Sequence, residues 1–172
     1  MRQLKLINPE NASEEEVKSY ATREAARAIV IDKDNKIALL YVSKSNYYKL
    51  PGGGIDEGEN KNSALLRECK EEIGCDVEVL GEIGSIVEYR KIQNLKQTSY
   101  CYLAKVKGDK GTPNFTESEI GAGFKQVWLS YDNALGAMRS GKPPHTEGKE
   151  YIKPRDTTFL EEAKTHLLNF IN

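Results

Sequence analysis

LPGGGIDEGENKNSALLRECKEEIGC, residues 50 to 75, is the stretch from which the fold of this chain is predicted. Pro51 to Gly54 cannot continue either a strand or a helix, so we expect a loop there. From about Asn62 the apolar residues recur at three- and four-residue spacing, which is typical of one face of a helix. Gly74 then supplies the usual C-terminal stop of a helix. The stretch therefore predicts a glycine-rich loop followed by a short helix.

Three glutamates share one face of this predicted helix. Each helical residue advances about 100° around the axis, so Glu68, Glu71 and Glu72 fall within one arc beside the apolar stripe. Like charges at this spacing destabilise a helix by about 0.2–0.5 kcal/mol per pair, and the negative end of the helix dipole adds to that cost. A bound cation would reverse the penalty. Hard oxygen ligands favour Mg²⁺, with Mn²⁺ as the second choice.

An ordinary explanation competes with this one, because most E-x-x-E-E patterns are solvated acidic faces of helices. Two neighbouring features favour a ligand site here. A glycine loop lies directly upstream, where a phosphorylated ligand needs close approach to the backbone, and Arg67 stands among the acids as a charge partner. We therefore interpret the three acids as a metal-binding group for the attack of water on a phosphate chain.

The spacing of the fixed residues resembles the Nudix box of the MutT-related hydrolases. All seven glycine or charged positions of that motif match, and they are Gly53, Glu59, Arg67, Glu68, Glu71, Glu72 and Gly74. Cys69 and Cys75 occupy two positions that are usually aliphatic, a departure that touches no catalytic position. The glycine loop contains neither a G-x-G-x-x-G pattern nor a Walker glycine-lysine pair, so dinucleotide-binding and P-loop folds are disfavoured.

The resemblance implies a fold of the α/β class. It is expected to be a Nudix-type α/β/α sandwich, with a central mixed β-sheet and two main helices. We expect a single Nudix hydrolase domain over residues 1–172. Within it, residues 1–22 are expected to form an N-terminal extension, and residues 50–75 to form the box with its lead-in loop.

The same resemblance implies roles for the residues of the box. The ligands of one or more Mg²⁺ or Mn²⁺ ions would be the Gly52 carbonyl, Glu68, Glu71 and Glu72. Arg67 would pair with a box carboxylate and fix its rotamer. Glu59 would brace the loop rather than bind metal directly.

The general base is left open between two positions. Members of the family use either a box glutamate, here Glu68, or an acid on a loop before the late strand. That loop offers Glu117 and Glu119, and we favour Glu119 because it adjoins the flexible segment 121–123. A solvated loop acid is an equally good description of Glu119.

Substrate contacts are expected from the glycine loop and its flanks. Gly53 and Gly54 have no side chains and would allow close approach of a phosphate chain. Lys44 and Lys49 would neutralise phosphate oxygens, although solvated lysines are the commoner case. Tyr48 would stack on a base, as would Tyr41 and Tyr47, although for Tyr41 core packing is equally well supported.

The rest of the chain alternates predicted strands and helices. Residues 26–31 and 37–42 predict a hairpin with its turn at 33–35, and further strands are expected at 77–89, 98–106 and 125–129. Capping boxes are expected at Ser13 with Glu16 and at Thr158 with Glu161. A short helix would run from Ser130 to Gly141, and a final helix would extend through Phe170 and Ile171. The segment between them, 141–155, is predicted as an extended proline-rich loop whose His145 and Arg155 cover the organic part of the substrate.

Composition narrows the class of protein. The 172 residues carry 25 Lys and Arg against 26 Asp and Glu, a net charge of −1, so the basic excess of a nucleic-acid binder is absent. No apolar run approaches the length of a membrane span, and a cytoplasmic location is expected. The three cysteines, Cys69, Cys75 and Cys101, sit among apolar neighbours and are expected to be buried and reduced. The expected partner is a small-molecule nucleotide, and the sequence is equally compatible with a monomer and with a homodimer.

These observations predict a metal-dependent diphosphohydrolase that cleaves the diphosphate of a nucleoside diphosphate linked to another group, X. When X is phosphate, the substrate is a nucleoside triphosphate, and the products are a monophosphate and pyrophosphate, as in the MutT-like branch. The alternatives are a hydrolase of ADP-ribose or nucleotide sugars, and a catalytically silent Nudix-fold nucleotide sensor.

Overall fold

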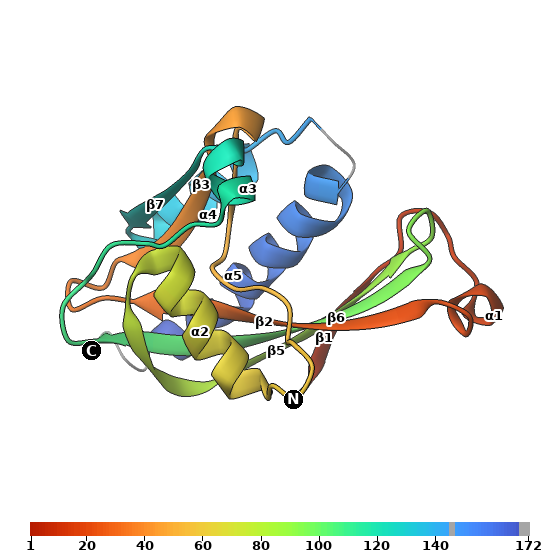
Figure 1. Ribbon diagram of the computed structural model, residues 1–172, viewed down its shortest axis with the longest axis horizontal. Coiled ribbons are helices and arrows are strands. Elements are labelled where there is room, and N and C mark those ends of the chain that lie inside the picture. Colours follow the sequence, from red (N-terminus) through yellow and green to blue (C-terminus); the bar gives the residue numbers. More distant parts are fainter. Residues whose placement is uncertain (145–146, 169–172) are drawn as a thin grey trace.

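A computed structural model describes residues 1–144 and 147–168 and shows a mixed seven-stranded sheet between two layers of helices (Figure 1). The strand order is β1-β5-β6-β2-β3-β4, and β7 pairs with β3. The strands are β1 (Gln3–Ile7), β2 (Ala21–Ile31), β3 (Ile37–Val42), β4 (Tyr47–Lys49), β5 (Asp76–Arg90), β6 (Leu95–Lys107) and β7 (Phe124–Leu129). The pairs β1–β5 and β2–β6 are parallel, and the other pairs are antiparallel.

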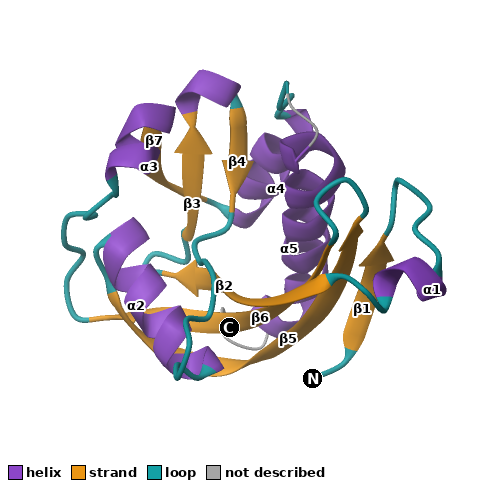
Figure 2. Ribbon diagram, turned by 45° about the vertical axis from the view of Figure 1, so that its right-hand side comes forward, coloured by secondary structure: helices purple, strands orange, loops and turns teal. Residues whose placement is uncertain are grey.

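The helices cover both faces of the sheet. They are α1 (Glu14–Val17), the 3₁₀ turn η1 (Ser43–Ser45), α2 (Lys61–Ile73), α3 (Glu117–Ala122), α4 (Tyr131–Ser140), the π-helical turn η2 (Glu147–Ile152) and α5 (Lys153–Leu168). Figure 2 shows α2 on one side of the sheet and α4 with α5 on the other. The predicted α/β/α sandwich with two main helices is confirmed.

Alternation along β2 explains the two layers. Ala26, Ala28 and Val30 belong to the core cluster beneath α2, whereas Ile29 and Ile31 belong to the cluster beneath α4 and α5. Successive side chains of a strand point to opposite faces, so one strand supplies both cores. The near-continuous apolar run of β2 is what a strand buried on both sides requires.

The predicted hairpin of β2 and β3 is confirmed, but the two strands separate almost at once. Only Ile31 and Ile37 are paired across the turn. Further along, residues 51–55 lie beside β2 in place of β3. The Ala28 and Ala26 N–H groups donate to the Pro51 and Gly53 carbonyls, both at 3.0 Å. The glycine loop is therefore fixed as a neighbour of a central strand.

Helix α2 has a defined beginning and end. Asn60 is its N-cap and exchanges hydrogen bonds with Ser63 in a capping box. Gly74 is its C-cap at φ 63°, and the Gly74 N–H donates to the carbonyls of Cys69 and Lys70. This confirms the predicted stop and shows that the helix starts one residue earlier than expected. All three cysteines are buried and free, as predicted.

The segment 1–22, predicted as an extension, contains two elements. β1 adds to the sheet edge beside β5, and the predicted capping box of Ser13 and Glu16 opens α1. Figure 1 shows α1 beside the far end of the long β5–β6 hairpin. Ala12, Val17 and Tyr20 pack there with residues of β5. The extent of the domain, residues 1–172, stays a prediction.

Three predictions after residue 110 are wrong. The loop proposed before the late strand contains helix α3, with Thr116 as its N-cap. The proposed loop 141–155 becomes helical from Glu147, and α5 begins at Lys153 rather than at Thr158. Proline is tolerated in the first turn of a helix, so Pro154 does not mark a break. Thr158 is no cap, because its hydroxyl donates to the Pro154 carbonyl one turn earlier. Phe170 and Ile171 lie outside the described residues.

We predict that Gly74→Ala lowers the free energy of unfolding by about 2–4 kcal/mol, as measured by urea denaturation. An added Cβ at Gly74 would lie 2.6 Å from the backbone of Gly111 and of Thr112, and φ is positive. Gly58→Ala is the matched control, because φ is 80° and nothing lies within 4 Å of the added Cβ. It should cost about 1–2 kcal/mol, the backbone contribution alone. Equal losses in the two variants would show that the contact with residues 111–112 is unimportant.

Candidate functional site

The three acids of α2 differ in their exposure to solvent. Side-chain exposure is 3% for Glu72, 13% for Glu68 and 46% for Glu71. The series follows their positions around the helix, from the face packed on the sheet to the face in water. One end of the acid cluster is therefore shielded and the other is open to a ligand.

Glu72 joins α2 to the glycine loop. Its Oε2 accepts a hydrogen bond from the Gly52 N–H at 2.6 Å, and its Oε1 accepts one from Lys49 Nζ at 3.1 Å. Burial raises the pKa of Glu72, while the Lys49 charge and the Gly52 N–H act in the opposite direction. A carboxylate with such surroundings favours additional positive charge.

Arg67 is the charge partner of the remaining acids. It makes two hydrogen bonds to Glu59, Nε to Oε1 at 3.0 Å and Nη2 to Oε2 at 2.9 Å. Its Nη1 donates to Glu68 at 2.8 Å and to Glu71 at 3.3 Å. Its Nη2 also donates to the Gly54 carbonyl at 3.0 Å. The hydrogen bonds to Glu59, and then those to Glu68, raise the pKa of Arg67 further above its usual value.

Glu59 therefore braces Arg67, which matches its predicted supporting role in geometry. Hydrogen bonds from Arg67 lower the pKa of Glu59 below its usual value. The planar guanidinium matches a carboxylate with two parallel bonds, which fixes the orientation of both groups. Arg67 consequently links the loop, through Gly54, to three carboxylates of the box.

The glycines of the loop are required by their neighbours. Gly52 has φ 129°, and a Cβ there would lie 2.2 Å from the Ala26 carbonyl oxygen. A Cβ on Gly53 would lie 2.2 Å from Glu68 Oε1, so its absence gives that carboxylate its space. A Cβ on Gly54 would lie 3.1 Å from Arg23 Nη2. Gly53 thus faces an acid, and Gly54 faces a guanidinium.

The acids do not converge on one point in this structure. Within residues 1–144 and 147–168, no group of three or more His, Cys, Asp or Glu side chains is arranged to hold a metal ion. The reason is visible in the contacts, because Glu72 faces Lys49 and Gly52 while Arg67 engages Glu68 and Glu71.

The donor set nevertheless fits a divalent cation. It consists of carboxylate oxygens of Glu68, Glu71 and Glu72 beside the Gly52 carbonyl, which accepts no hydrogen bond from the described residues. Mg²⁺ and Mn²⁺ prefer such oxygen ligands. Binding would require Glu68 and Glu71 to exchange Arg67 for the cation.

Lys44 and Tyr48, predicted to contact substrate, lie apart from the acids. Lys44 is in η1, where it neighbours Gly123, and Tyr48 stacks on Tyr41 with ring centroids 4.7 Å apart. In the described structure neither side chain is bonded to Glu68, Glu71 or Glu72. Their roles stay predictions, whereas Lys49 is brought directly to the site.

Glu119 is also placed differently from the prediction of a flexible loop. It is the third residue of α3, and its carboxylate accepts hydrogen bonds from the Thr116 N–H at 2.8 Å and the Thr116 hydroxyl at 2.9 Å. These bonds form the capping box of that helix. To act as a base, Glu119 would have to leave this cap.

The suggestion that His145 and Arg155 cover the substrate is wrong for Arg155. That side chain is buried, and it donates to Asp156 at 2.7 Å and to Glu88 at 3.2 Å. His145 lies outside the described residues.

The sequence did not lead us to predict Arg23 and Arg27 of β2 as residues of the site. Arg23 and Arg27 point to the same face, because residues four apart in a strand do so. Arg27 is buried, and its Nε has no hydrogen-bond partner within residues 1–144 and 147–168. Burial lowers the pKa of Arg27 to about 10. The signal was the presence of two arginines at even spacing inside an otherwise alanine-rich strand.

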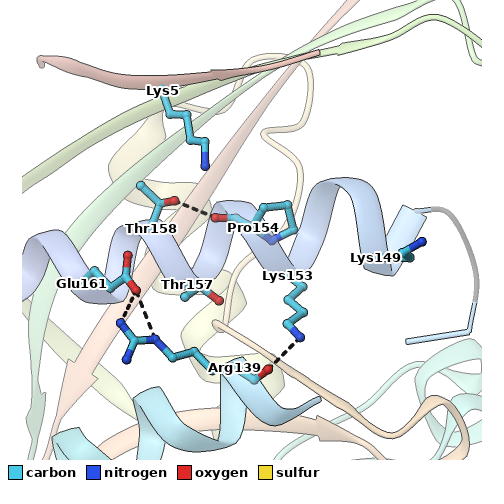
Figure 3. Close-up of a pocket in the computed structure, with 8 residues that line it drawn as sticks. All are labelled: Lys5, Arg139, Lys149, Lys153, Pro154, Thr157, Thr158 and Glu161. Carbon is cyan, nitrogen blue, oxygen red and sulfur yellow. Dashed lines mark hydrogen bonds and ion pairs between the residues drawn. The ribbon is translucent and has the colours of Figure 1, made fainter. Parts of the chain in front are cut away.

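Two shallow pockets bear on where a substrate could lie. One, of about 450 Å³, borders the box at the start of α2 and is lined by Glu24, Ile55, Glu59, Asn60, Lys61, Asn62 and Tyr102. The other, of about 370 Å³, lies along α5 and contains no residue of the box (Figure 3). There Lys153 donates to main-chain carbonyls and Arg139 pairs with Glu161, so these cations are already engaged. Of these two pockets, the first is the one with a fixed box residue, Glu59, in its lining, and its lining includes none of Glu68, Glu71 and Glu72.

Comparisons with known proteins identify the family. The model of the NUDIX domain family matches residues 21–153. Diphosphoinositol polyphosphate phosphohydrolase 2 of Homo sapiens is 27% identical over 134 residues, which cover 76% of this chain and 71% of that protein. No helix among the described residues is long and apolar enough to cross a membrane.

Solved structures share the fold at low sequence identity. A NUDIX hydrolase from Nitrosomonas europaea superposes with a TM-score of 0.62 at 16% identity, over 88% of this chain and 97% of that one. The MutT protein from Methanosarcina mazei Go1 gives a TM-score of 0.60 at 16% identity, over 86% of this chain and 96% of that one. The family match spans the glycine loop, all seven box positions and most of the sheet. The chain therefore belongs to the NUDIX domain family and is a Nudix hydrolase.

Proposed function

We propose that this protein is a Mg²⁺-dependent diphosphohydrolase that cleaves the diphosphate of a nucleoside diphosphate linked to X, including nucleoside triphosphates. One observation carries the proposal. Glu72 is a buried carboxylate hydrogen-bonded to the N–H of the glycine loop, with Glu68 and Glu71 beside it on the open side of the same helix. This places acidic oxygens next to a backbone that has room for a phosphate chain.

The residues that would hold the cation are Glu68, Glu71, Glu72 and the Gly52 carbonyl. When bound, Mg²⁺ would neutralise charge on the phosphate oxygens and lower the pKa of a coordinated water. Arg67 holds Glu68 and Glu71 near each other before the cation arrives, which reduces their mutual repulsion. Because Gly53 has no side chain, the Glu68 carboxylate can lie directly against the backbone of the loop.

Arg23 is the group that we assign to a phosphate oxygen of the substrate. Its Nη1 donates to Gln97 Oε1 at 3.0 Å, which leaves Nε and Nη2 without a hydrogen-bond acceptor among the described residues. These two nitrogens lie next to Gly54. The Nε–Nη2 edge of a guanidinium binds two oxygens of a phosphate at once.

We assign the general base to Glu68, with Glu119 as the alternative. Glu68 lies beside the glycine loop, and Arg67 is the only described residue that donates a hydrogen bond to its carboxylate. Glu119 is hydrogen-bonded within its own capping box. The assignment to Glu68 requires no rearrangement of α3.

The identity of X is the most open part of the proposal. The relative named above is named for diphosphoinositol polyphosphates, which are also diphosphates, so they form a second candidate substrate class. A silent sensor is the weaker alternative, because all three acids of the box are present and adjoin the loop.

A substrate panel tests the proposal. Purified protein with Mg²⁺ is incubated with normal and oxidised nucleoside triphosphates, ADP-ribose, nucleotide sugars, dinucleoside polyphosphates and a diphosphoinositol polyphosphate, and products are identified by chromatography. We expect a nucleoside monophosphate together with phosphorylated X, and no turnover in EDTA. Turnover of the diphosphoinositol compound alone would move the substrate to the second class. Tight nucleotide binding without turnover of any compound would favour the sensor.

We predict that Glu72→Gln lowers kcat by about 10²–10⁴-fold while the melting temperature of the metal-free protein stays equal or rises. Burial raises the pKa of Glu72 in the folded state above its unfolded value. The contribution of Glu72 to the free energy of unfolding is therefore fully present below the pKa that its carboxyl has in the unfolded chain. It is lost as the pH rises through the higher pKa of the folded protein. The charged form costs stability at neutral pH, and glutamine removes that cost.

Thermal melts of both proteins at pH 4 and pH 7.5 check this sign. The melting temperature of Glu72→Gln should exceed that of the parent by more at pH 7.5 than at pH 4, because the parent carboxyl is protonated at low pH. Glu78→Gln, at an exposed position of β5, is the control and should change neither kcat nor the melt. Near-normal activity of Glu72→Gln would remove Glu72 from the metal site.

Glu119→Gln separates the two candidate bases. If Glu68 is the base, the rate should stay within about threefold of the parent, whereas loss of a general base typically costs about 10²–10⁴-fold. Glu117→Gln changes a neighbouring charge on α3 without touching the Thr116 cap and serves as the control. A hundredfold loss in Glu119→Gln alone would transfer the role to Glu119.

Arg23→Lys should raise KM about tenfold or more with a smaller change in kcat, because lysine keeps the charge but loses the two-nitrogen edge. Steady-state kinetics on the best substrate of the panel measure both constants. Lys36→Arg, the reverse exchange at an exposed turn position, is the control. An unchanged KM in Arg23→Lys would contradict the phosphate contact.

A further inference from the structure

The glycine loop is attached to both helical layers of the protein. On one side the Gly52 N–H donates to Glu72 of α2 at 2.6 Å. Two residues earlier, the Leu50 N–H donates to Asp156 of α5 at 2.9 Å. Both carboxylates are buried, and they come from helices on opposite faces of the sheet. The loop is therefore held between two acids that are far apart in the sequence.

Asp156 is itself fixed by a network of buried polar side chains. Its Oδ1 accepts from Arg155 Nε at 2.7 Å, and Arg155 Nη1 donates to Glu88 Oε1 at 3.2 Å. Glu88 Oε2 accepts from Arg90 at 2.7 Å and from Gln97 at 3.2 Å. The exposure of Asp156 is 0% and that of Arg155 is 2%. The Asp156 side chain is consequently held in the orientation in which Oδ2 accepts the hydrogen bond from the Leu50 N–H.

Arg27 links this network electrostatically to the acid cluster. Arg27 lies on β2 directly behind the loop, since a Cβ on Gly52 would lie 2.9 Å from its Cα. In the described part of the chain, the Arg27 Nε has no hydrogen-bond partner. Arg27 interacts electrostatically with both Asp156 and Glu72. A change at Asp156 therefore alters the surroundings of Glu72 as well as the anchoring of the loop.

We propose that Asp156 is a positioning residue for the metal site, which it serves by fixing residues 50–52 so that the Gly52 N–H stays on Glu72. Its effect on catalysis rests on the proposed function, but its effect on the loop does not. Loss of the Leu50 bond removes one anchor of the loop while those to Ala26 and Ala28 remain, and the Gly52 bond two residues later opens more often. The Gly52 carbonyl and Glu72 then lose the fixed relation that a shared cation needs.

The test compares Asp156→Asn with Glu161→Gln on the same helix. Glu161 pairs with Arg139 at the surface of α5, away from the loop (Figure 3). In both variants and the parent, amide exchange of Leu50 and Gly52 is followed by NMR at a temperature well below the melt. Mn²⁺ affinity of the protein without substrate is measured from the signal of free Mn²⁺ in electron paramagnetic resonance.

We expect amide exchange of Gly52 to accelerate about tenfold in Asp156→Asn. The dissociation constant for Mn²⁺ should rise by about 10-fold or more, as found when groups that orient metal ligands are lost. Both quantities should stay at the parent value in Glu161→Gln. A role limited to stability would lower the melting temperature of Asp156→Asn and leave Gly52 exchange and Mn²⁺ affinity unchanged, and that result would overturn the proposal.

Arg155→Lys provides the second variant should Asp156→Asn not fold. Lysine keeps the buried charge but loses the Nε bond that orients Asp156. The same two quantities should change in the same direction by a smaller factor, and no change in either would also overturn the proposal. A parent protein that binds no Mn²⁺ and hydrolyses no substrate would refute the proposed function, whereas amide exchange at Gly52 would still decide the role of Asp156.

Discussion

The hydrogen bond from the Gly52 N–H to Glu72 is the interaction on which the site depends. A buried carboxylate is costly unless it is paired and hydrogen-bonded, and Glu72 obtains both from Gly52 and Lys49. Lys49 ends β4 and Gly52 lies in the loop that follows it, so neither partner comes from α2 itself. The bond is possible because β3 leaves β2 after a single pair, which opens a position beside β2 that residues 51–55 occupy. The site thus forms because β3 separates from β2 and leaves the edge of β2 to the glycine loop.

Arg67 offsets the repulsion between the carboxylates of the acid cluster when no metal ion is bound. Glu68 and Glu71 lie within reach of each other on one helix, and the guanidinium between them offsets their repulsion. Glu59 in turn fixes the guanidinium through two parallel bonds. This arrangement also explains why the three acids do not converge. Arg67 pairs with Glu68 and Glu71, whereas Lys49 pairs with Glu72. A bound metal ion would take over part of this charge compensation.

Local signals in the sequence identified the main elements around the box. Asn60 and Gly74 bound α2 because capping depends on residue type at the helix ends. The hairpin turn was likewise predicted from residues that tolerate tight backbone geometry. The failure at the C-terminal helix concerns a segment whose conformation depends on distant partners. Thr158 with Glu161 satisfied the pattern of a cap, but Lys153 and Arg155 have partners on α4 and β5 that support a longer helix. Helix α3 was missed because a six-residue segment carries little periodicity of its own.

The sequence by itself determined the family, the position of the acid-bearing helix and the identity of the residues offered to a cation. It did so because the box is contiguous and its spacing reflects the geometry of one loop and one helix. The tertiary structure decided which acid is buried, which side chains neighbour the loop and how the loop is held. Glu72, Arg23 and Asp156 meet the loop from α2, β2 and α5, across separations of 20 to 106 residues in the bonded pairs. Such contacts follow from the packing of two helical layers on a divided sheet, and no local pattern of residues encodes them.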